Sequence, residues 1–409
     1  MNEHSDEPQL KRVIGFPLLV LYALGVTIGA GIYVLIGTTA ARAGIYAPVA
    51  FLLAAFVMAF NAGSFAEFST RIPQSAGEAV YVHAGFGQSW LTLAVGGSII
   101  LSATIAAAAI SLGSAGYVGA LVDLPQPVIV VVIIGLMGLL AAWGVAESVM
   151  FAGILTVIEL LGLLVIVYAG FQHNPQIFSN LPEVFPALDD RTALIGIFAA
   201  SLIAFFAFIG FNDVVNLVEE TRNPSKVMPW AIIVSLVIVT LVYFLVVLVA
   251  VRTVSPDDLA ASKAPIGLLF ERLTGLSPVS VTLIGIVATL NGVVIQIIVA
   301  ARVIYGLKRK IKLPAILTKV NKATGTPLNA TILVTISIIV LALFMPLEAL
   351  AELTSQIILS VFTLVNISLI VVKWRGDAAP DNVFTVPLII PVVGALCCIL
   401  LLFGSLIFI

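Results

Sequence analysis

One acidic residue stands in the middle of a long apolar run of this chain. Glu159 lies within FAGILTVIELLGLLVIVYAG, about a dozen residues from either end of the run. An ionisable side chain at the centre of a lipid bilayer is costly and usually has a function. Glu159 could bind and release a proton at physiological pH if its environment tunes it to do so. The alternative is a permanently protonated structural residue that is held by hydrogen bonds.

Glycines interrupt the first apolar run. Residues Gly25–Gly37 read GVTIGAGIYVLIG, with Gly29 and Gly31 on either side of Ala30. Each interior glycine weakens a helix by roughly 1 kcal/mol relative to alanine. Backbone N–H and C=O groups without hydrogen-bond partners are tolerated at membrane depth only where they are buried in protein or line a cavity. The pattern predicts a helix that breaks at this point; the alternative is that the glycines permit close helix packing.

A second interruption is predicted within Leu202–Glu220, LIAFFAFIGFNDVVNLVEE. Gly210 is followed by Asn212 and Asp213 in an otherwise apolar run. Asn and Asp are strong N-cap residues. We expect one half-helix to end near Ala207–Ile209 and another to begin near Asn212. A kinked helix that tolerates a polar pair is the alternative.

Two interrupted helices that face each other would make a site for a zwitterion. Helix N-termini present N–H donors and partial positive charge, which suits a carboxylate, whereas helix C-termini present carbonyl groups, which suit an ammonium group. We expect backbone around Gly29–Ile32 to hold the carboxylate. Backbone around Ala207–Ile209, with carbonyls near Ile28, would hold the ammonium group.

The remaining chemistry-bearing residues argue against other functions. The chain is 61% hydrophobic and 10% charged, whereas soluble domains carry about 25% charged residues. Cys397 and Cys398 are adjacent, and the three histidines, His4, His83 and His173, lie far apart. We therefore expect a polytopic membrane protein without a metal site or cofactor, and not an enzyme. The net charge of −2 gives no reason to expect a nucleic-acid partner.

The elements that must position these residues are membrane helices. About twenty apolar residues span a bilayer. Eleven apolar runs are predicted to do so, near 15–37, 45–68, 90–119, 127–145, 148–171, 192–216, 229–251, 279–306, 328–346, 350–373 and 385–409.

Basic residues predict the orientation of these spans. With a cytoplasmic N-terminus, Lys and Arg divide 14 to 5 in favour of the cytoplasmic side, and the cluster Lys308–Lys312 contributes most. Because cytoplasmic loops carry an excess of Lys and Arg, residues 1–14 are predicted to be a cytoplasmic tail. Eleven spans then place the C-terminus outside a plasma or inner membrane.

The two halves of the chain look alike. Each half begins with an interrupted span, and each has a long link after its second span, at 69–89 and at 252–278. An odd number of spans per repeat turns the second copy upside down, as in many transporters. The prediction is an all-α membrane protein with a first repeat at 15–171, an inverted repeat at 192–373, and an added helix at 385–409.

Four segments make the chain similar to a known family. They read GVTIGAGIYVLIG at Gly25–Gly37, AEFSTRIPQSAGEAVYVHAGFG at Ala66–Gly87, FFAFIGFNDVVNLVEETRNPSKVMP at Phe205–Pro229, and ATLNGVVIQIIVAARVIYGLKRK at Ala288–Lys310. Together they resemble the amino acid–polyamine–organocation superfamily of transporters, in the branch of bacterial amino acid permeases related to cationic amino acid transporters.

The resemblance implies a LeuT-like 5+5 inverted repeat with broken helices 1 and 6, and alternating access. It also implies substrate carboxylate contacts at Gly29-Ala30-Gly31 and amine contacts at backbone carbonyls around Phe206–Phe208. With the residues expected from the interrupted helices, the candidate substrate-binding residues are Ile28, Gly29, Ala30, Gly31 and Ile32 in the first span, and Phe206, Ala207, Phe208, Ile209 and Asn212 in the sixth. Glu159 falls where some family members have a lysine, at the position that a sodium ion takes in sodium-dependent relatives. Asn212 replaces an acidic residue that is usual in cationic permeases.

These observations predict a secondary transporter of amino acids, coupled to protons through Glu159. Span three, residues 94–119, contains no acidic residue, which favours a neutral or small substrate. The alternatives are an uncoupled exchanger of amino acids or polyamines and, from other classes, a channel or a membrane-embedded enzyme. An enzyme would need a nucleophile and base at one depth, which the sequence does not suggest. The partners are then the substrate, protons and the lipid bilayer, and the oligomeric state stays open.

Overall fold

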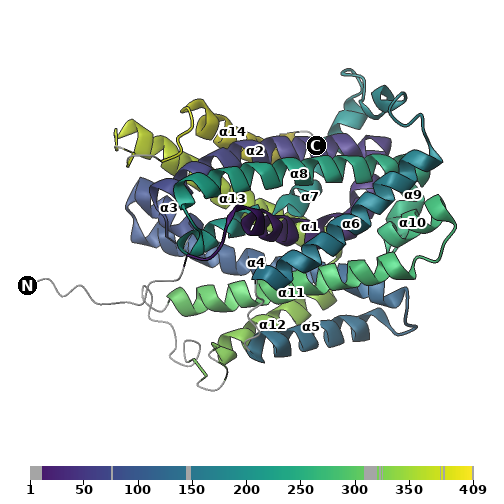
Figure 1. The fold of residues 1–409 in the computed structure, drawn as a ribbon, viewed down its shortest axis with the longest axis horizontal. Helices are drawn as coiled ribbons and strands as arrows, with labels where there is room; N and C mark the ends of the chain where they lie inside the picture. Colours follow the sequence, from purple (N-terminus) through teal and green to yellow (C-terminus); the bar gives the residue numbers. More distant parts are fainter. Residues whose placement is uncertain are drawn as a thin grey trace, which may run out of the picture.

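Helices form nearly all of the structure that can be described. The computed structural model describes residues 12–74, 77–143, 149–307, 320, 321, 324, 326–377, 379, 380 and 383–407. Figure 1 shows these helices running back and forth along a bundle. This arrangement suits a bilayer, because a helix satisfies every backbone hydrogen bond within its own segment.

The first half of the described chain contains α1 (Phe16–Ala43), η1 (Gly44–Tyr46), α2 (Ala47–Arg71), α3 (Gly77–Phe86), α4 (Ser89–Gly119), α5 (Gln126–Trp143) and α6 (Val149–His173). The second half contains η2 (Leu181–Val184), α7 (Arg191–Phe208), η3 (Phe211–Glu220), α8 (Pro224–Thr253), α9 (Pro256–Ala261), α10 (Pro265–Thr274), α11 (Val279–Leu307), α12 (Leu328–Phe344), α13 (Leu347–Trp374) and α14 (Ile389–Ile407). Elements labelled η are 3-10 helices.

Eight helical stretches of the described chain are long and apolar enough to cross a membrane. Two shorter apolar helices, Leu328–Phe344 and Ile389–Gly404, and the first part of α1, Phe16–Gly29, accompany them. The predicted apolar runs fall on these helices to within a few residues. The protein is therefore an all-helical, multi-pass membrane protein.

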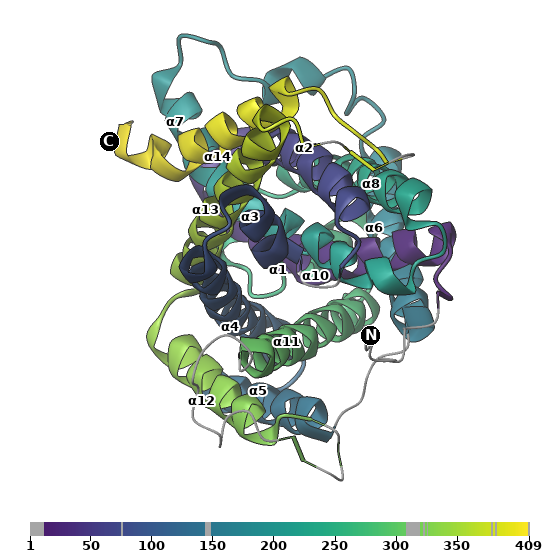
Figure 2. The same cartoon turned by 90° about the vertical axis from the view of Figure 1, so that its left-hand side faces the viewer.

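The first span lies at the centre of the bundle. Helix α1 packs against α6, α7 and α8, while α4 packs against α11 and α13. Figure 2 shows α1 surrounded by these helices, with α5 and α12 on one side and α14 on the other. The glycine-rich helix α1 and helix α7, which begins the predicted sixth span, are therefore neighbours in the interior.

The predicted interruption of the first span is wrong. Helix α1 is continuous from Phe16 to Ala43, through Gly29 and Gly31. A glycine costs about 1 kcal/mol in a helix, which is less than the several kcal/mol lost when a backbone group is left unpaired in lipid. Gly31 instead permits close approach: a Cβ atom at this position would lie 2.6 Å from the Ala207 Cβ and 2.9 Å from the Ala207 carbonyl oxygen.

The predicted interruption within Leu202–Glu220 is confirmed. Helix α7 ends at Phe208 and η3 begins at Phe211. Gly210 has a φ of +127°, a conformation that L side chains rarely adopt. A Cβ atom at Gly210 would also lie 2.8 Å from the carbonyl oxygen of Val26 in α1. The chain therefore breaks where α7 comes closest to α1.

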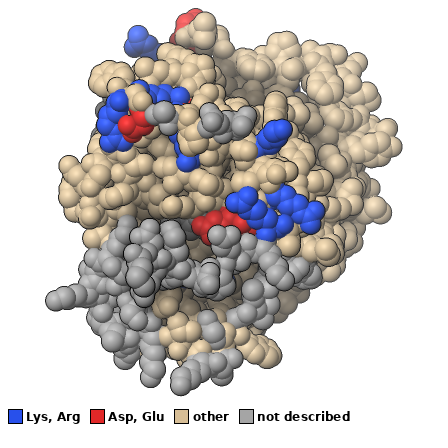
Figure 3. Space-filling model, turned by 60° about the vertical axis from the view of Figure 1, so that its left-hand side comes forward, with Lys and Arg blue, Asp and Glu red and all other residues tan. Residues whose placement is uncertain are grey.

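Charged side chains gather at the end of the bundle that carries α3, which we call the α3 end. Buried Glu67 of α2 pairs with Arg71 and with Lys373 of α13, each at 2.7 Å. Arg375 donates hydrogen bonds to the carbonyl groups of Ala84 and Gly85 in α3. Figure 3 shows groups of acidic and basic side chains on this end, within an otherwise uncharged surface. The predicted cluster Lys308–Lys312 lies outside the described residues.

The opposite end of the bundle carries α9 and α10, and we call it the α9 end. Arg42 at the end of α1 pairs with Glu352 of α13. Arg252 at the end of α8 pairs with Glu183 at 2.7 Å. The basic residues predicted for opposite sides of the membrane thus lie at opposite ends of the bundle.

The last described helix, α14, is fixed by buried polar groups. The Asn366 amide of α13 donates to the Asn61 side-chain oxygen of α2 at 2.7 Å. The Asn61 amide contacts the Cys398 sulfur of α14 at 3.3 Å. Buried polar groups need partners, so this cluster sets how α14 packs on α2 and α13.

Candidate functional site

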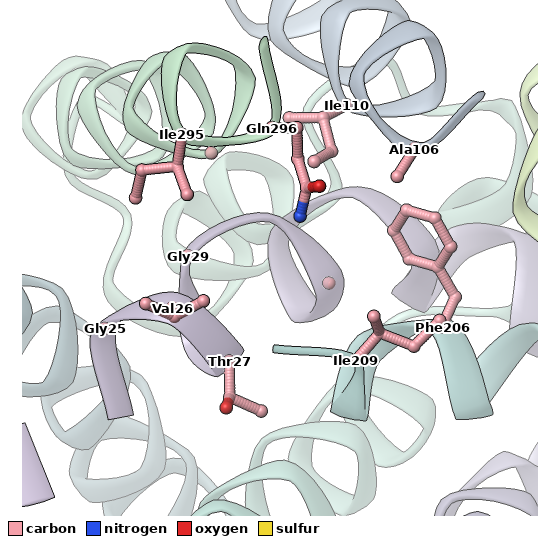
Figure 4. A pocket seen from close by; sticks show the side chains of 12 residues that line it. Gly25, Val26, Thr27, Gly29, Ala106, Ile110, Phe206, Ile209, Ile295 and Gln296 are labelled. Carbon is pink, nitrogen blue, oxygen red and sulfur yellow. The ribbon is translucent and has the colours of Figure 1, made fainter. Parts of the chain in front are cut away.

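A small cavity lies where α1 meets the interrupted end of α7. It encloses about 30 Å³. Figure 4 shows side chains from α1, α4, α7 and α11 around it. Its lining consists of Gly25, Val26, Thr27, Gly29, Gly31, Ala106, Ile110, Phe206, Ile209, Gly292, Ile295 and Gln296.

Backbone groups, rather than charged side chains, dominate the α1 and α7 walls. Ala207 lies among the last residues of α7, so its carbonyl group has no partner within that helix. The Tyr243 hydroxyl of α8 lies 3.0 Å from this oxygen and 2.8 Å from the carbonyl oxygen of Thr27 in α1. One phenol therefore joins the two helices beside the cavity, donating its proton to either oxygen.

The predicted substrate residues of the first span do not all face the cavity. Gly29 and Gly31 line it. Ile28 and Ile32 are fully buried and stand outside its lining. The side chain of Ala30 lies outside what the structure describes.

Only some of the predicted residues of the sixth span line the small cavity. Phe206 and Ile209 line the small cavity. Ala207 is in contact with Gly31, and Phe208 packs its ring against Tyr243. Asn212 lines a different cavity, described below.

Residues of α4 and α11 complete the lining, and the sequence reasoning did not name them. They are Ala106 and Ile110 of α4 and Gly292, Ile295 and Gln296 of α11, with Val26 and Thr27 added from α1. A run of small residues such as that in α4 is equally typical of close helix packing. Gln296 was detectable as a polar side chain inside an apolar run, although its direction depends on how α11 packs.

A larger cavity of about 580 Å³ opens beside the small one, toward the α3 end. Both cavities share Ala106, Ile209 and Gln296. The larger one is also lined by the acidic residues Glu78, Asp213 and Glu220 and by the basic residue Arg302. Three residues therefore border both the small cavity and this wider vestibule.

Asn212 organises the acidic wall of this vestibule. Its amide nitrogen donates to Glu78 Oε1 at 2.8 Å and lies 3.4 Å from Asp213 Oδ1. Burial raises the pKa of Glu78, while hydrogen bonds from its own backbone and from Asn212 offset part of that rise. Asn212 thus acts on the vestibule and not on the small cavity.

A third cavity, of about 250 Å³, lies at the α9 end and includes Lys263 and Glu348. It shares no lining residue with the small cavity. On the wall of the third cavity, the Tyr117 hydroxyl of α4 donates to the Tyr33 carbonyl oxygen of α1 at 2.7 Å, and Val34 packs where a side chain at Gly113 would clash. Helices α1 and α4 are therefore in close contact at this cavity.

Glu159 lies beside α1, away from the small cavity. It is 1% exposed, in the middle of α6. The Tyr33 hydroxyl donates to the Glu159 backbone carbonyl at 3.2 Å. This hydrogen bond joins α6 to α1.

This geometry agrees with a comparison to known families. The model of a family described as amino acid permease matches residues 14–409. The chain belongs to the amino acid permease family. It is therefore a membrane permease rather than an enzyme, and its family transports amino acids.

Individual relatives resemble the permease over most of its length. The branched-chain amino acid permease BcaP of Bacillus subtilis is 30% identical over 97% of this chain and 89% of its own length. The methylthioribose transporter of the same organism is 26% identical over 98% and 89%. The vacuolar cationic amino acid transporter 2 of Arabidopsis thaliana is 30% identical over 91% of this chain, which spans 61% of that longer protein.

Proposed function

We propose that this permease is a secondary active transporter that carries neutral amino acids by alternating access. The supporting observation is the small cavity at the break of α7, which shares lining residues with a wide vestibule at one end and none with the cavity at the other end. A carrier needs such a site that is accessible from one side at a time.

The substrate's two charged groups would be bound mainly by backbone. The ammonium group is placed beside the carbonyl oxygens of Thr27 and Ala207, which the Tyr243 hydroxyl holds close to each other. The carboxylate is placed beside Gly29 and Gly31, where the α1 backbone carries no side chains. Two opposite charges on one ligand make a charged protein side chain unnecessary.

A neutral substrate side chain fits the walls of the small cavity. Its lining residues in α4, α7 and α11 are uncharged, and most are apolar. A cationic or anionic side chain would be desolvated there without a partner, which is strongly unfavourable.

The helix order supports a LeuT-like architecture. We assign α1, α2, α4, α5 and α6 to a first repeat within 15–171. The second, inverted repeat comprises α7 with η3, α8, α11, α12 and α13 within 192–373, and α14 is an eleventh span within 385–409. The interrupted α7 begins the second repeat, and the glycine-rich α1 begins the first. With a cytoplasmic N-terminus and an external C-terminus, the vestibule at the α3 end faces the cytoplasm.

Glu159 is the proposed site of proton coupling. Its carboxyl is buried in α6, and its backbone carbonyl accepts a hydrogen bond from the Tyr33 hydroxyl of α1. Protonation changes the charge beside these contacts, and a buried charge interacts strongly across a low dielectric. Proton binding can therefore bias how α1 and α7 sit around the substrate.

Uptake into proteoliposomes tests both parts of this proposal. Radiolabelled neutral amino acids are offered with and without an inward proton gradient. We expect the gradient to drive accumulation above the external concentration, and Glu159→Gln to abolish that accumulation while counterflow persists. Glu183→Gln, which removes an exposed carboxyl at the α9 end, is the matched control. Gradient-independent uptake by the wild type would identify an uncoupled exchanger instead.

A further inference from the structure

One polar side chain in the small cavity has no assigned partner. Thr27 and Gln296 are the polar side chains of its lining. The Thr27 hydroxyl donates to the Ala23 carbonyl at 2.8 Å within its own helix. For the Gln296 amide, no hydrogen bond joins it to another residue in the described part of the chain.

Gln296 occupies the room that a substrate side chain would use. It projects from α11, and Figure 4 shows its amide reaching across the cavity toward the glycine-containing wall of α1. With the substrate main chain held against α1 and α7, the α-substituent must point toward α4 and α11. The Gln296 amide therefore meets the substrate at its side chain.

The surroundings of this amide are apolar. Ile110, Ile295 and Phe206 share the cavity with it, and Gly292 lies one turn away on α11. In the inward-open structure the amide also borders the vestibule, where water can reach it. When the cavity closes around a substrate, that water is excluded. An amide left without a partner then disfavours binding, whereas a hydroxyl on the substrate satisfies it.

The small size of the cavity restricts the substrate further. The cavity encloses about 30 Å³, and the substrate main chain must use the same space. A small α-substituent therefore fits more readily than a long or aromatic one.

We propose that Gln296 makes the permease selective for small neutral amino acids that carry a side-chain hydroxyl, such as serine and threonine. This inference rests on the proposed function, because it names the substrate class of the same site. Threonine and valine have nearly the same shape, and they differ by one hydroxyl in place of one methyl. Comparing their binding isolates the contribution of a hydrogen bond.

The experiment measures the inhibition constants of threonine and valine against a radiolabelled substrate in proteoliposomes. The wild type is expected to bind threonine about tenfold more tightly than valine. Gln296→Met keeps a side chain of similar length without hydrogen-bonding groups, and it is expected to bring the ratio to about one or below. Gln356→Met in α13, which lies outside the lining of all three cavities, is the matched control and should keep the wild-type ratio.

A second variant guards against a misfolded protein. Gln296→Ser shortens the side chain, carries a small hydroxyl in place of the amide and opens the cavity, so leucine is expected to become a competitor. Equal affinities of the wild type for threonine and valine, or an unchanged ratio in Gln296→Met, would overturn the role of Gln296. A wild type that binds no amino acid at all would overturn the proposed function itself.

Discussion

Gly31→Ala tests whether direct backbone contact between α1 and α7 builds the substrate site. The added methyl group would lie 2.6 Å from the Ala207 Cβ and 2.9 Å from the Ala207 carbonyl oxygen, and closer still to the Ala207 Cα. Contacts below 3.0 Å essentially never occur at real Cβ atoms. Since Ala207 offers no flexible side-chain tip that could move away, the two helices must separate.

The expected magnitude follows from this geometry. Overpacking a buried contact costs about 1–3 kcal/mol, while replacing an interior helical glycine by alanine returns about 1 kcal/mol to folding. The folded protein should therefore lose at most about 2 kcal/mol. Separation of α1 from α7 also displaces the oxygens of Thr27 and Ala207 that flank the ammonium position. A loss of about 2 kcal/mol in binding corresponds to a roughly thirtyfold higher Kd.

The assay is equilibrium binding of a radiolabelled neutral amino acid to purified protein, with thermal unfolding measured on the same samples. Gly97→Ala in α4 is the control, because nothing lies within 4 Å of the added methyl group. The control should bind normally and be as stable as the wild type or more so. A Gly31→Ala protein that folds and binds with wild-type Kd would refute the assignment of the site to the α1–α7 contact.

Three further predictions follow from the contacts around this site. Tyr243→Phe removes the hydroxyl that meets the Thr27 and Ala207 oxygens, so Kd should rise about tenfold, and an unchanged Kd in binding assays would contradict that role. Because burial raises the pKa of Glu78, its folded form holds a proton more tightly than the unfolded chain does, and stability falls as pH rises from the ordinary carboxyl pKa through the raised one. Glu78→Gln should thus raise the melting temperature relative to wild type at alkaline pH and not at acid pH, and a pH-independent difference would argue against it. Glu67→Gln leaves two cations without their buried partner and should cost about 3 kcal/mol, seen as a lower melting temperature; full thermal stability would show that solvent compensates.

The positions of the spans could be predicted from sequence because each needs a run of apolar residues. The break of α7 was also predictable, since Gly210 with Asn212 and Asp213 interrupts such a run with residues that favour turns and helix starts. The continuity of α1 was not predictable. A glycine weakens a helix and permits close packing in equal measure, and the position of Ala207 beside Gly31 decides which effect matters.

The substrate site could be predicted only in part, for a related reason. A helix that is apolar on all sides does not reveal which face points inward. Ile28 and Ile32 lie in the same apolar run as Gly29 and Gly31, yet they stand outside the cavity lining. Gln296 and Ile110 line it only because α11 and α4 pack together against α1. A hydrogen bond between residues far apart in the sequence, such as that of Asn212 with Glu78, cannot be predicted from the residues around either one.

Counterflow tests the central claim most directly. Proteoliposomes loaded with an unlabelled neutral amino acid are diluted into a trace of the labelled one, with no ion gradient. A carrier with one alternately exposed site predicts transient accumulation of label, saturable with the internal amino acid and weakened in Gly31→Ala. Label that only equilibrates, at a rate independent of the internal amino acid, would indicate a channel and contradict the account.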